Sequence, residues 1–265
     1  MKLIDIAANL TSSQFNADRE QVIARAIDAG VDRLLVLGTS LRDSEGALEL
    51  ARRYPGTVWA TAGVHPHDAK HWSADAAKRI DELLREPEVL CVGECGLDLE
   101  RNFSPPDDQH RAYREQVELA IEHRLPLYLH ERGSADELLA VLEPRRSELR
   151  AVVVHCFTGE GPTLDRYLAL DLHIGITGWI CDERRGFHLH PLVARIPHDR
   201  LMVETDAPYL LPRTLRPKPK GRRNEPSYLP AVIEQIATCT GETPQAVAAR
   251  TTATAERFLG LPAID

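Results

Sequence analysis

Residues 89–98 read VLCVGECGLD, an apolar run that leads directly into a carboxylate between two glycines. Consecutive apolar side chains without polar alternation indicate a strand that is buried on both faces, as in a parallel sheet. The flanking glycines allow the backbone and a ligand to approach Glu94 closely. We therefore expect a central parallel strand that delivers Glu94 to its carboxyl end.

Similar apolar, β-branched runs recur along the whole chain. We expect eight strands, at residues 3–8, 33–37, 57–62, 89–92, 126–129, 151–154, 172–176 and 201–204. The clearest helical patterns lie at 17–29, 73–84, 107–124, 228–239 and 243–258. Strands that alternate with helices in this way predict an α/β protein with a closed, TIM-type (β/α)8 barrel rather than an open doubly wound sheet. Because such a barrel takes about 250 residues, we expect residues 1–265 to form a single domain.

The composition argues against several classes of protein, namely general nucleic-acid binders, disulfide-bonded proteins and membrane proteins. The formal net charge of −8 argues against binding of nucleic acid over the whole surface, although a local basic groove is still compatible with it. The five cysteines are odd in number, and a domain of this size needs no disulfides, which indicates a reduced protein. No segment has the ~20 apolar residues that cross a bilayer, and we expect no signal peptide before the first strand. We expect a cytoplasmic monomer without membrane association.

Metal-competent side chains follow five of the apolar runs. They are His65, Glu94, His130, His155 and Asp206. Because the carboxyl ends of barrel strands meet at one rim, we expect these side chains to converge there. Each histidine alone has a structural explanation as a hydrogen-bonded residue, and each carboxylate alone could cap a helix or form a salt bridge. Together they predict a mixed N/O metal centre.

Roles within this centre can be suggested from chemistry. Asp206 could ligate a metal, or orient and deprotonate the attacking water. The proline after His65 would aim the His65 side chain, which we expect to contact a substrate phosphate or to orient a ligand. His67 has an alternative explanation as a solvated residue.

A proline-rich basic loop follows the eighth predicted strand. Residues 211–226 contain four prolines and six arginines or lysines. Arginine binds phosphate through forked hydrogen bonds, and lysine binds it as a point charge. Four aromatic residues near strand ends could stack on bases of a single strand, namely Phe103, Phe157, Trp179 and Tyr209. The alternatives are a solvated loop and aromatic residues that pack inside the fold.

Several motifs resemble the TatD family of metal-dependent DNases over essentially the whole chain. They are DIAANLT at 5–11, AGVHPH at 62–67, GECGLD at 93–98, HCFTG at 155–159, ETDAPY at 204–209 and RRNEP at 222–226. The resemblance implies an amidohydrolase-like TIM barrel, a divalent metal, and hydrolysis of DNA phosphodiesters, commonly from 3′ to 5′.

The chain departs from the family pattern at two places. Most members carry His-x-His at the end of the first strand, where this chain has Ala7 and Asn9. This difference resembles the TatD subgroup proper and shifts the expected metal ligands to Glu94, His130 and His155. The aspartate that often follows Arg132 in relatives is Gly133 here.

The residues and the resemblance together predict a 3′–5′ exonuclease that prefers single-stranded DNA, or RNA, and acts in DNA repair or turnover. Mg²⁺ is the expected metal, with Mn²⁺ or Zn²⁺ as alternatives. The expected residues are Glu94, His130 and His155 for the metal, Asp206, Glu204 and His65 for catalysis, and Arg132, Arg222, Arg223, Asn9 and Tyr209 for the substrate.

Two other functions are compatible with the same pattern. The same barrel and ligands serve small-molecule amide or ester hydrolases and deaminases. A non-catalytic binding protein is the other, with a site that decayed when Ala7 and Asn9 replaced the two histidines.

Overall fold

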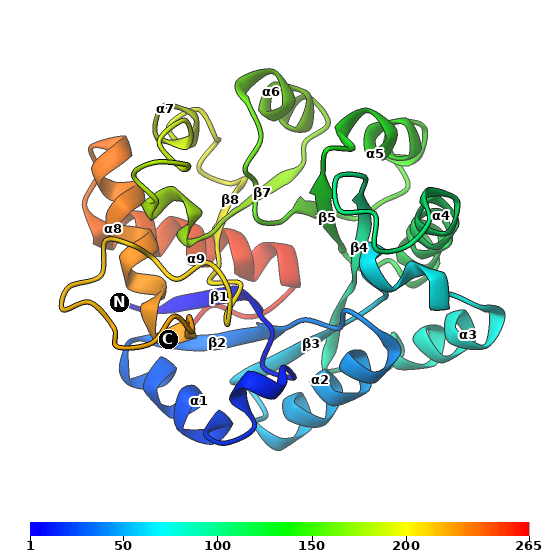
Figure 1. The fold of residues 1–265 in the computed structure, drawn as a ribbon, viewed down its shortest axis with the longest axis horizontal. Coiled ribbons are helices and arrows are strands. Elements are labelled where there is room, and N and C mark those ends of the chain that lie inside the picture. The colour runs from blue at the N-terminus through cyan, green and yellow to red at the C-terminus, as the bar shows by residue number, and fades with distance from the viewer. Residues whose placement is uncertain (265) are drawn as a thin grey trace. The chain divides into compact units, whose positions relative to one another are not determined.

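A computed structural model describes residues 1–264. The strands are β1 (Leu3–Ala8), β2 (Val31–Val36), β3 (Val58–Ala62), β4 (Val89–Asp98), β5 (Leu127–Arg132), β6 (Val152–Val154), β7 (His173–Ile176) and β8 (Leu201–Val203). They form one sheet in chain order from β1 to β8. The backbone N–H of Asp206 donates to Ala7, and that of Asn9 donates to Ala207, so the ends of β8 and β1 lie side by side. This strand order confirms the predicted (β/α)8 class (Figure 1).

Helices separate the strands along the chain. They are α1 (Arg19–Asp28), α2 (Leu41–Arg53), α3 (Ala74–Leu83), α4 (Pro106–His123), α5 (Ala135–Leu142), α6 (Gly161–Ala169), α7 (Leu189–Val193), α8 (Leu229–Thr240) and α9 (Pro244–Leu259). The five helices expected from their sequence patterns are present, with ends that differ by a residue or two. None of the described helices is long and apolar enough to cross a membrane.

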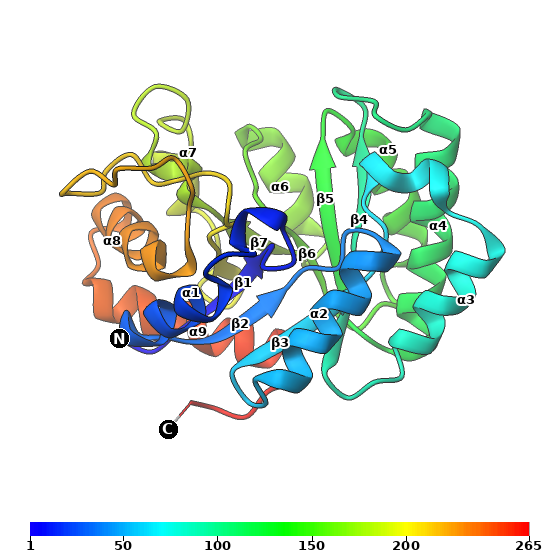
Figure 2. The same ribbon diagram turned by 60° about the horizontal axis from the view of Figure 1, so that its bottom comes forward.

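Contacts divide the chain into two compact units. The first combines residues 1–35 with the chain from Cys156 onward, and the second is Val36–His155. In the second unit α2 packs on β3 and α4 packs on β4 (Figure 2). The expected metal ligands all belong to the second unit, whereas Asn9, Glu204, Asp206 and the basic loop belong to the first.

Strand β4 is longer than expected because it continues through the glycine motif to Asp98. Both glycines have positive φ values, 130° at Gly93 and 132° at Gly96. A Cβ atom would lie 2.3 Å from the Tyr128 carbonyl oxygen at Gly93 and 2.0 Å from the His130 carbonyl oxygen at Gly96. The glycines therefore let the backbones of β4 and β5 approach each other. The predicted close approach of a backbone is confirmed, and the approach of a ligand stays a prediction.

The pairing of β4 with β5 is irregular at the same place. The register shifts between Val92 and Cys95, so Glu94 lies in the interrupted part of the ladder. An irregularity of this kind redirects a side chain relative to a straight strand. It explains why Glu94 sits within a strand and still faces the site.

Candidate metal centre

Three of the expected ligands converge in the second unit. His155 Nε2 lies 2.8 Å from Glu94 Oε1, and His130 Nδ1 lies 3.1 Å from the same oxygen. Glu94 and His155 are each only 4% exposed, and His130 is half-buried. One ligand atom from each residue lies within 4.8 Å of the other two. The structure therefore brings together the three residues that the sequence pattern selects as ligands.

The electrostatics favour an ionised Glu94. Burial by itself would raise the pKa of this carboxyl group, but the imidazoles of His155, His65 and His130 outweigh burial and hold the pKa well below its usual range. A buried carboxylate beside two imidazoles is a mixed N/O donor set that suits divalent cations such as Mg²⁺, Mn²⁺ and Zn²⁺. The cluster could therefore hold a metal ion.

Asp98 determines which nitrogen of His130 is available to a metal. His130 Nε2 lies 3.4 Å from Asp98 Oδ2, while Nδ1 faces Glu94. If Nδ1 gives its lone pair to a metal, Nε2 must carry the proton, and the Asp98 carboxylate is the acceptor beside it. Asp98 is fully buried, and burial by itself would raise the pKa of its carboxyl group. The neighbouring His130, the backbone N–H of Arg101 and His67 outweigh burial and keep this pKa below its usual value.

Asp98 is not among the residues expected in the site, although it belongs to the GECGLD motif at residues 93–98. A signal was present, because Glu94 and Asp98 are four residues apart, and alternate residues of a strand face the same side. The expectation that the strand ended at residue 92 removed this signal.

His65 is held as a hydrogen-bond donor. Its Nδ1 accepts the backbone N–H of His67 at 3.0 Å, so the proton of the neutral ring lies on Nε2, which faces Glu94 Oε1 at 3.3 Å. Burial lowers the pKa of His65 to about 4, so the ring is neutral near pH 7. In this tautomer His65 can donate to a carboxylate or a phosphate, but it cannot ligate a metal through Nε2.

His67 is not a solvated residue. Its Nε2 lies 2.7 Å from Asp98 Oδ2, and its ring makes a T-shaped contact with Phe103, with 4.7 Å between ring centroids. His65, His67 and His130 form a second group whose nitrogens lie close enough to hold an ion. That group is poorly prepared for a metal, because His67 and His130 both turn Nε2 to Asp98 and His65 has its Nδ1 occupied by the backbone.

The first unit places Asn9 and Asp206 together. Asn9 Nδ2 donates to Asp206 Oδ1 at 2.9 Å, where β1 and β8 end. Asp206 has a φ of 54°, a left-handed conformation that Asp adopts more readily than most residues. The Asn9 amide therefore orients the Asp206 carboxylate.

Glu204 lies in the same unit but is held differently. It is fully buried and accepts the backbone N–H of Cys156. A Cβ atom on Gly175 would lie 2.8 Å from Glu204 Oε1, so the glycine leaves room for the carboxylate against β7. Glu204 therefore links the segments that follow β6 and β8.

The two arginines at the end of the basic loop differ in their environment. The Arg223 guanidinium is paired with Asp18 and Glu225, at 2.7 Å each, and lies over the Phe15 ring. Arg222 is exposed, and its side chain has no acidic partner within residues 1–264. Arg132 is half-buried, with its Nε 3.7 Å from Glu100 Oε2.

The aromatic residues also fall into two groups. Tyr209 is 54% exposed and Phe103 is 60% exposed, so both rings are accessible. Phe157 is 3% exposed and packs against Tyr167, with 6.1 Å between ring centroids. The expectation that Phe157 stacks on a base is wrong, because a buried ring offers no face to a base.

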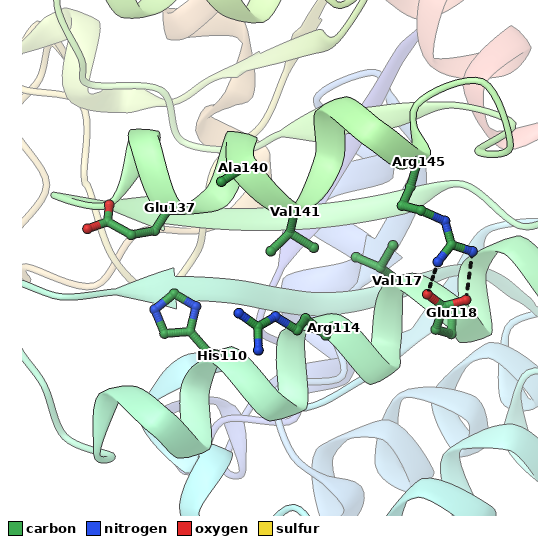
Figure 3. A pocket seen from close by; sticks show the side chains of 8 residues that line it. All are labelled: His110, Arg114, Val117, Glu118, Glu137, Ala140, Val141 and Arg145. Carbon is green, nitrogen blue, oxygen red and sulfur yellow. Dashed lines mark hydrogen bonds and ion pairs between the residues drawn. The ribbon is translucent and has the colours of Figure 1, made fainter.

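A separate hollow of about 400 Å³ lies between α4 and α5 in the second unit (Figure 3). Its lining residues are His110, Arg114, Val117, Glu118, Glu137, Ala140, Val141 and Arg145. An ion pair between Glu118 and Arg145 lies at one end. None of the expected site residues lines this hollow, so it is distinct from the metal centre.

Comparisons with known proteins agree with these features. A family model described as "TatD related DNase" matches residues 4–260. A protein of Erwinia billingiae named "3'-5' ssDNA/RNA exonuclease TatD" is 51% identical over 261 residues, which cover 98% of this chain and 100% of the relative. A TatD homologue of Escherichia coli K12 superposes with a TM-score of 0.87 at 27% identity, covering 98% of both chains. A TatD family hydrolase of Entamoeba histolytica has a TM-score of 0.89 at 24% identity over 98% of both chains, which shows the fold.

Proposed function

Because the chain belongs to the TatD family of DNase-related proteins, we propose that it is a metal-dependent 3′–5′ exonuclease acting on single-stranded DNA or RNA. The observation that carries the proposal is the convergence of Glu94, His130 and His155 on one point. The 51% identity to a protein named as such an exonuclease supports the substrate class and the direction. We include in this proposal a role in DNA repair or turnover.

Glu94, His130 through Nδ1 and His155 through Nε2 would hold the metal, with Mg²⁺ the proposed ion and Mn²⁺ or Zn²⁺ as alternatives. Bound there, a divalent cation polarises a phosphate oxygen and lowers the pKa of a water molecule. Asp98 keeps the proton of His130 on Nε2, so that Nδ1 retains its lone pair. The buried, ionised Glu94 supplies the negative charge that retains a cation.

His65 and Asp206 would handle the phosphate and the proton. His65 Nε2–H is proposed to donate to a non-bridging phosphate oxygen, which requires the neutral tautomer described above. Asp206 is proposed to accept the proton of the attacking water, and the Asn9 amide orients its carboxylate for this role. Glu204 remains a second proposed acid/base group. Most of the rate enhancement would come from positioning and charge stabilisation.

Substrate contacts are proposed for Arg132, Arg222, Arg223, Asn9 and Tyr209. Arg222 and Tyr209 are exposed and suit direct contact with a phosphate and a base. Arg223 is already paired with two carboxylates, so it would act chiefly by anchoring the loop that carries Arg222.

We further propose that residues 1–265 act as a single domain, as a monomer in the cytoplasm. The family model spans nearly the whole chain, from residue 4 to residue 260, which supports the single domain.

The experiment follows the length of a 5′-labelled single strand incubated with metal-stripped protein, with and without Mg²⁺ or Mn²⁺. We expect metal-dependent shortening from the 3′ end, and no shortening with His155→Ala. Cleavage that persists in this variant would refute the site assignment. If wild-type protein cleaved neither DNA nor RNA with any metal, the exonuclease proposal would be wrong and a small-molecule hydrolase would replace it.

A further inference from the structure

Two loops of the first unit lie against each other. The loop after β7 covers residues 178–187, and the loop after β8 covers residues 207–223. A Cβ atom on Gly178 would lie 2.2 Å from the Leu210 carbonyl oxygen, so the loops touch through their backbones. Arg213 extends this contact, because it pairs with Asp182 at 3.7 Å and Glu183 at 3.3 Å.

The surface is strongly basic in an acidic protein. Residues 207–223 contain six arginines or lysines and no acidic residue, whereas the whole chain carries a net charge of −8. Arg213 and Arg223 are paired with carboxylates, and Arg216 donates to backbone carbonyls of its own loop. Arg185, in the loop after β7, pairs with Asp182 at 2.9 Å. The remaining cations of the two loops are exposed and lack an acidic partner within the described part of the chain, and these are Arg184, Lys218, Lys220 and Arg222.

Large aromatic rings accompany these free cations. Phe187 is 66% exposed and Tyr209 is 54% exposed, the two most exposed rings of the first unit. Phe187 rests against the His190 ring with 5.0 Å between centroids, which supports one side of the ring. A third ring, Trp179, already stacks on the Arg185 guanidinium at 4.4 Å.

We propose that this surface holds single-stranded nucleic acid, in addition to the residues that meet the reacting phosphate. The strand-binding surface, as we define it, consists of Arg184, Phe187, Tyr209, Lys218, Lys220 and Arg222. Phe187 and Tyr209 stack on bases, and the four cations bind phosphates. The inference rests on the proposed nuclease function and adds a mode of strand binding to it.

The combination of rings and cations selects this partner. Free cations alone suit any polyanion, including duplex DNA and acidic proteins. Exposed rings add affinity only when bases are unstacked and free to lie on them, which is a property of single strands. An acidic protein surface has charge but no row of flat rings to pair with Phe187 and Tyr209.

The test measures how KM depends on strand length with the metal-loaded enzyme. We expect the KM of the wild-type enzyme to fall as strands lengthen from two to about 16 nucleotides, the upper range of site sizes for such surfaces. For the longest strand, Phe187→Ala should raise KM about fivefold or more, and the conservative Phe187→Trp should restore it. Lys218→Ala combined with Lys220→Ala should also reduce the dependence of KM on salt, by a slope of about 0.7 per lost phosphate contact.

Matched controls come from exposed residues outside the surface. Lys78 on α3 is an exposed lysine, and Ile27 on α1 is 45% exposed, so Lys78→Ala and Ile27→Ala should leave the length dependence unchanged. Circular dichroism verifies that each variant is folded.

Three outcomes would contradict the proposals, and they are distinguishable. If wild-type enzyme cleaves strands but its KM does not depend on length, or the Phe187 and Lys variants retain that dependence, the strand-binding surface is refuted. Heparin carries charge but no bases and can displace a bound strand. If heparin displaces the strand equally well from the wild-type enzyme and from Phe187→Ala, and this variant binds strands with wild-type affinity, base stacking is refuted. If wild-type enzyme cleaves no strand at all, the proposed function itself has failed.

Discussion

The metal cluster of the second unit and the Asn9–Asp206 pair of the first unit each hold a carboxylate, but with different neighbours. Glu94 lies within β4, and Asp206 follows β8. Glu94 is surrounded by imidazoles that offer lone pairs and protons, whereas Asp206 accepts a hydrogen bond from a neutral amide. Imidazole nitrogens ligate transition metals well, and an amide does so poorly. The comparison teaches that the three expected ligands lie together in one unit, whereas the carboxylate of the other unit is oriented by a hydrogen bond from an amide.

Removing a ligand should have the largest effect. His155→Ala removes one of the two imidazoles that are proposed to ligate the metal beside Glu94. It should reduce metal affinity and turnover by more than about 100-fold, because losing a residue that only supports a ligand already costs about 10- to 100-fold. Metal content after dialysis and single-strand cleavage measure the two effects. His110→Ala, in the hollow between α4 and α5, provides a folded control with normal values. Equal metal content in both variants would show that the cluster is not the metal site.

Asp98→Asn should have the next largest effect. The Asp98 carboxylate has two acceptor oxygens, which face the His67 ring and the backbone N–H of Arg101. An amide has only one acceptor oxygen, so it cannot serve both of these donors and also attract the proton of His130. Metal affinity should therefore fall about 10- to 100-fold. Titration with Mn²⁺ by electron paramagnetic resonance measures the affinity, and saturating metal should recover most of the turnover. Asp108→Asn on α4 serves as the matched control. A loss of turnover that excess metal does not restore would indicate a different role for Asp98.

Asn9→Ala should lower turnover without lowering metal affinity, and so distinguish the roles of the two units. The change removes a hydrogen bond to a charged group, which contributes about 1.5–3 kcal/mol, so turnover should fall roughly 10- to 100-fold. Metal affinity should stay within about twofold of the wild-type value, because the ligands belong to the second unit. If Asn9→Ala lowered metal affinity as strongly as Asp98→Asn, the proposed division of roles would be wrong.

The smallest effect concerns the anchor of the basic loop. Hydrogen bonds from Arg223 and Arg25 lower the pKa of Asp18 from 3.8 to about 2. The folded pKa is depressed, so this stabilisation is present above pH 3.8 and is lost as pH falls through about 2. Asp18→Asn should lower the free energy of unfolding by about 1 kcal/mol or less at pH 6, since such partly exposed pairs contribute little. Urea unfolding of both proteins at pH 6 and pH 2 measures this, and an equal difference at both values would contradict the pairing.

Much of the fold and the convergence of the three expected ligands were predictable because both depend on local sequence. Buried parallel strands read as apolar runs, and a side chain just after such a run lies at the strand end. Hence β3, β5, β6 and β8 lie close to their expected positions, and Glu94, His130 and His155 come together. The extension of β4 was missed because glycines usually indicate that a strand ends, whereas here they permit close approach to β5.

The roles of single side chains were harder to predict. Arg222 and Arg223 are neighbours with the same chemistry, yet only Arg223 meets Asp18 and Glu225. Asp18 is more than 200 residues away from it in sequence, and no local pattern indicates such a partner. Phe187 was likewise overlooked, because exposure of a ring depends on what covers it.

The sequence alone determined the fold class, the family and the residue types available for a metal, since periodicity and motifs are properties of the chain itself. The tertiary structure decided how these residues are used. It places the Nδ1 atom of His65 against a backbone N–H, turns the Nε2 atom of His130 to Asp98, and leaves Arg222 without the partners that Arg223 has. Tautomers, hydrogen-bond partners and exposure depend on distances between atoms that are remote in sequence, and only folding sets those distances.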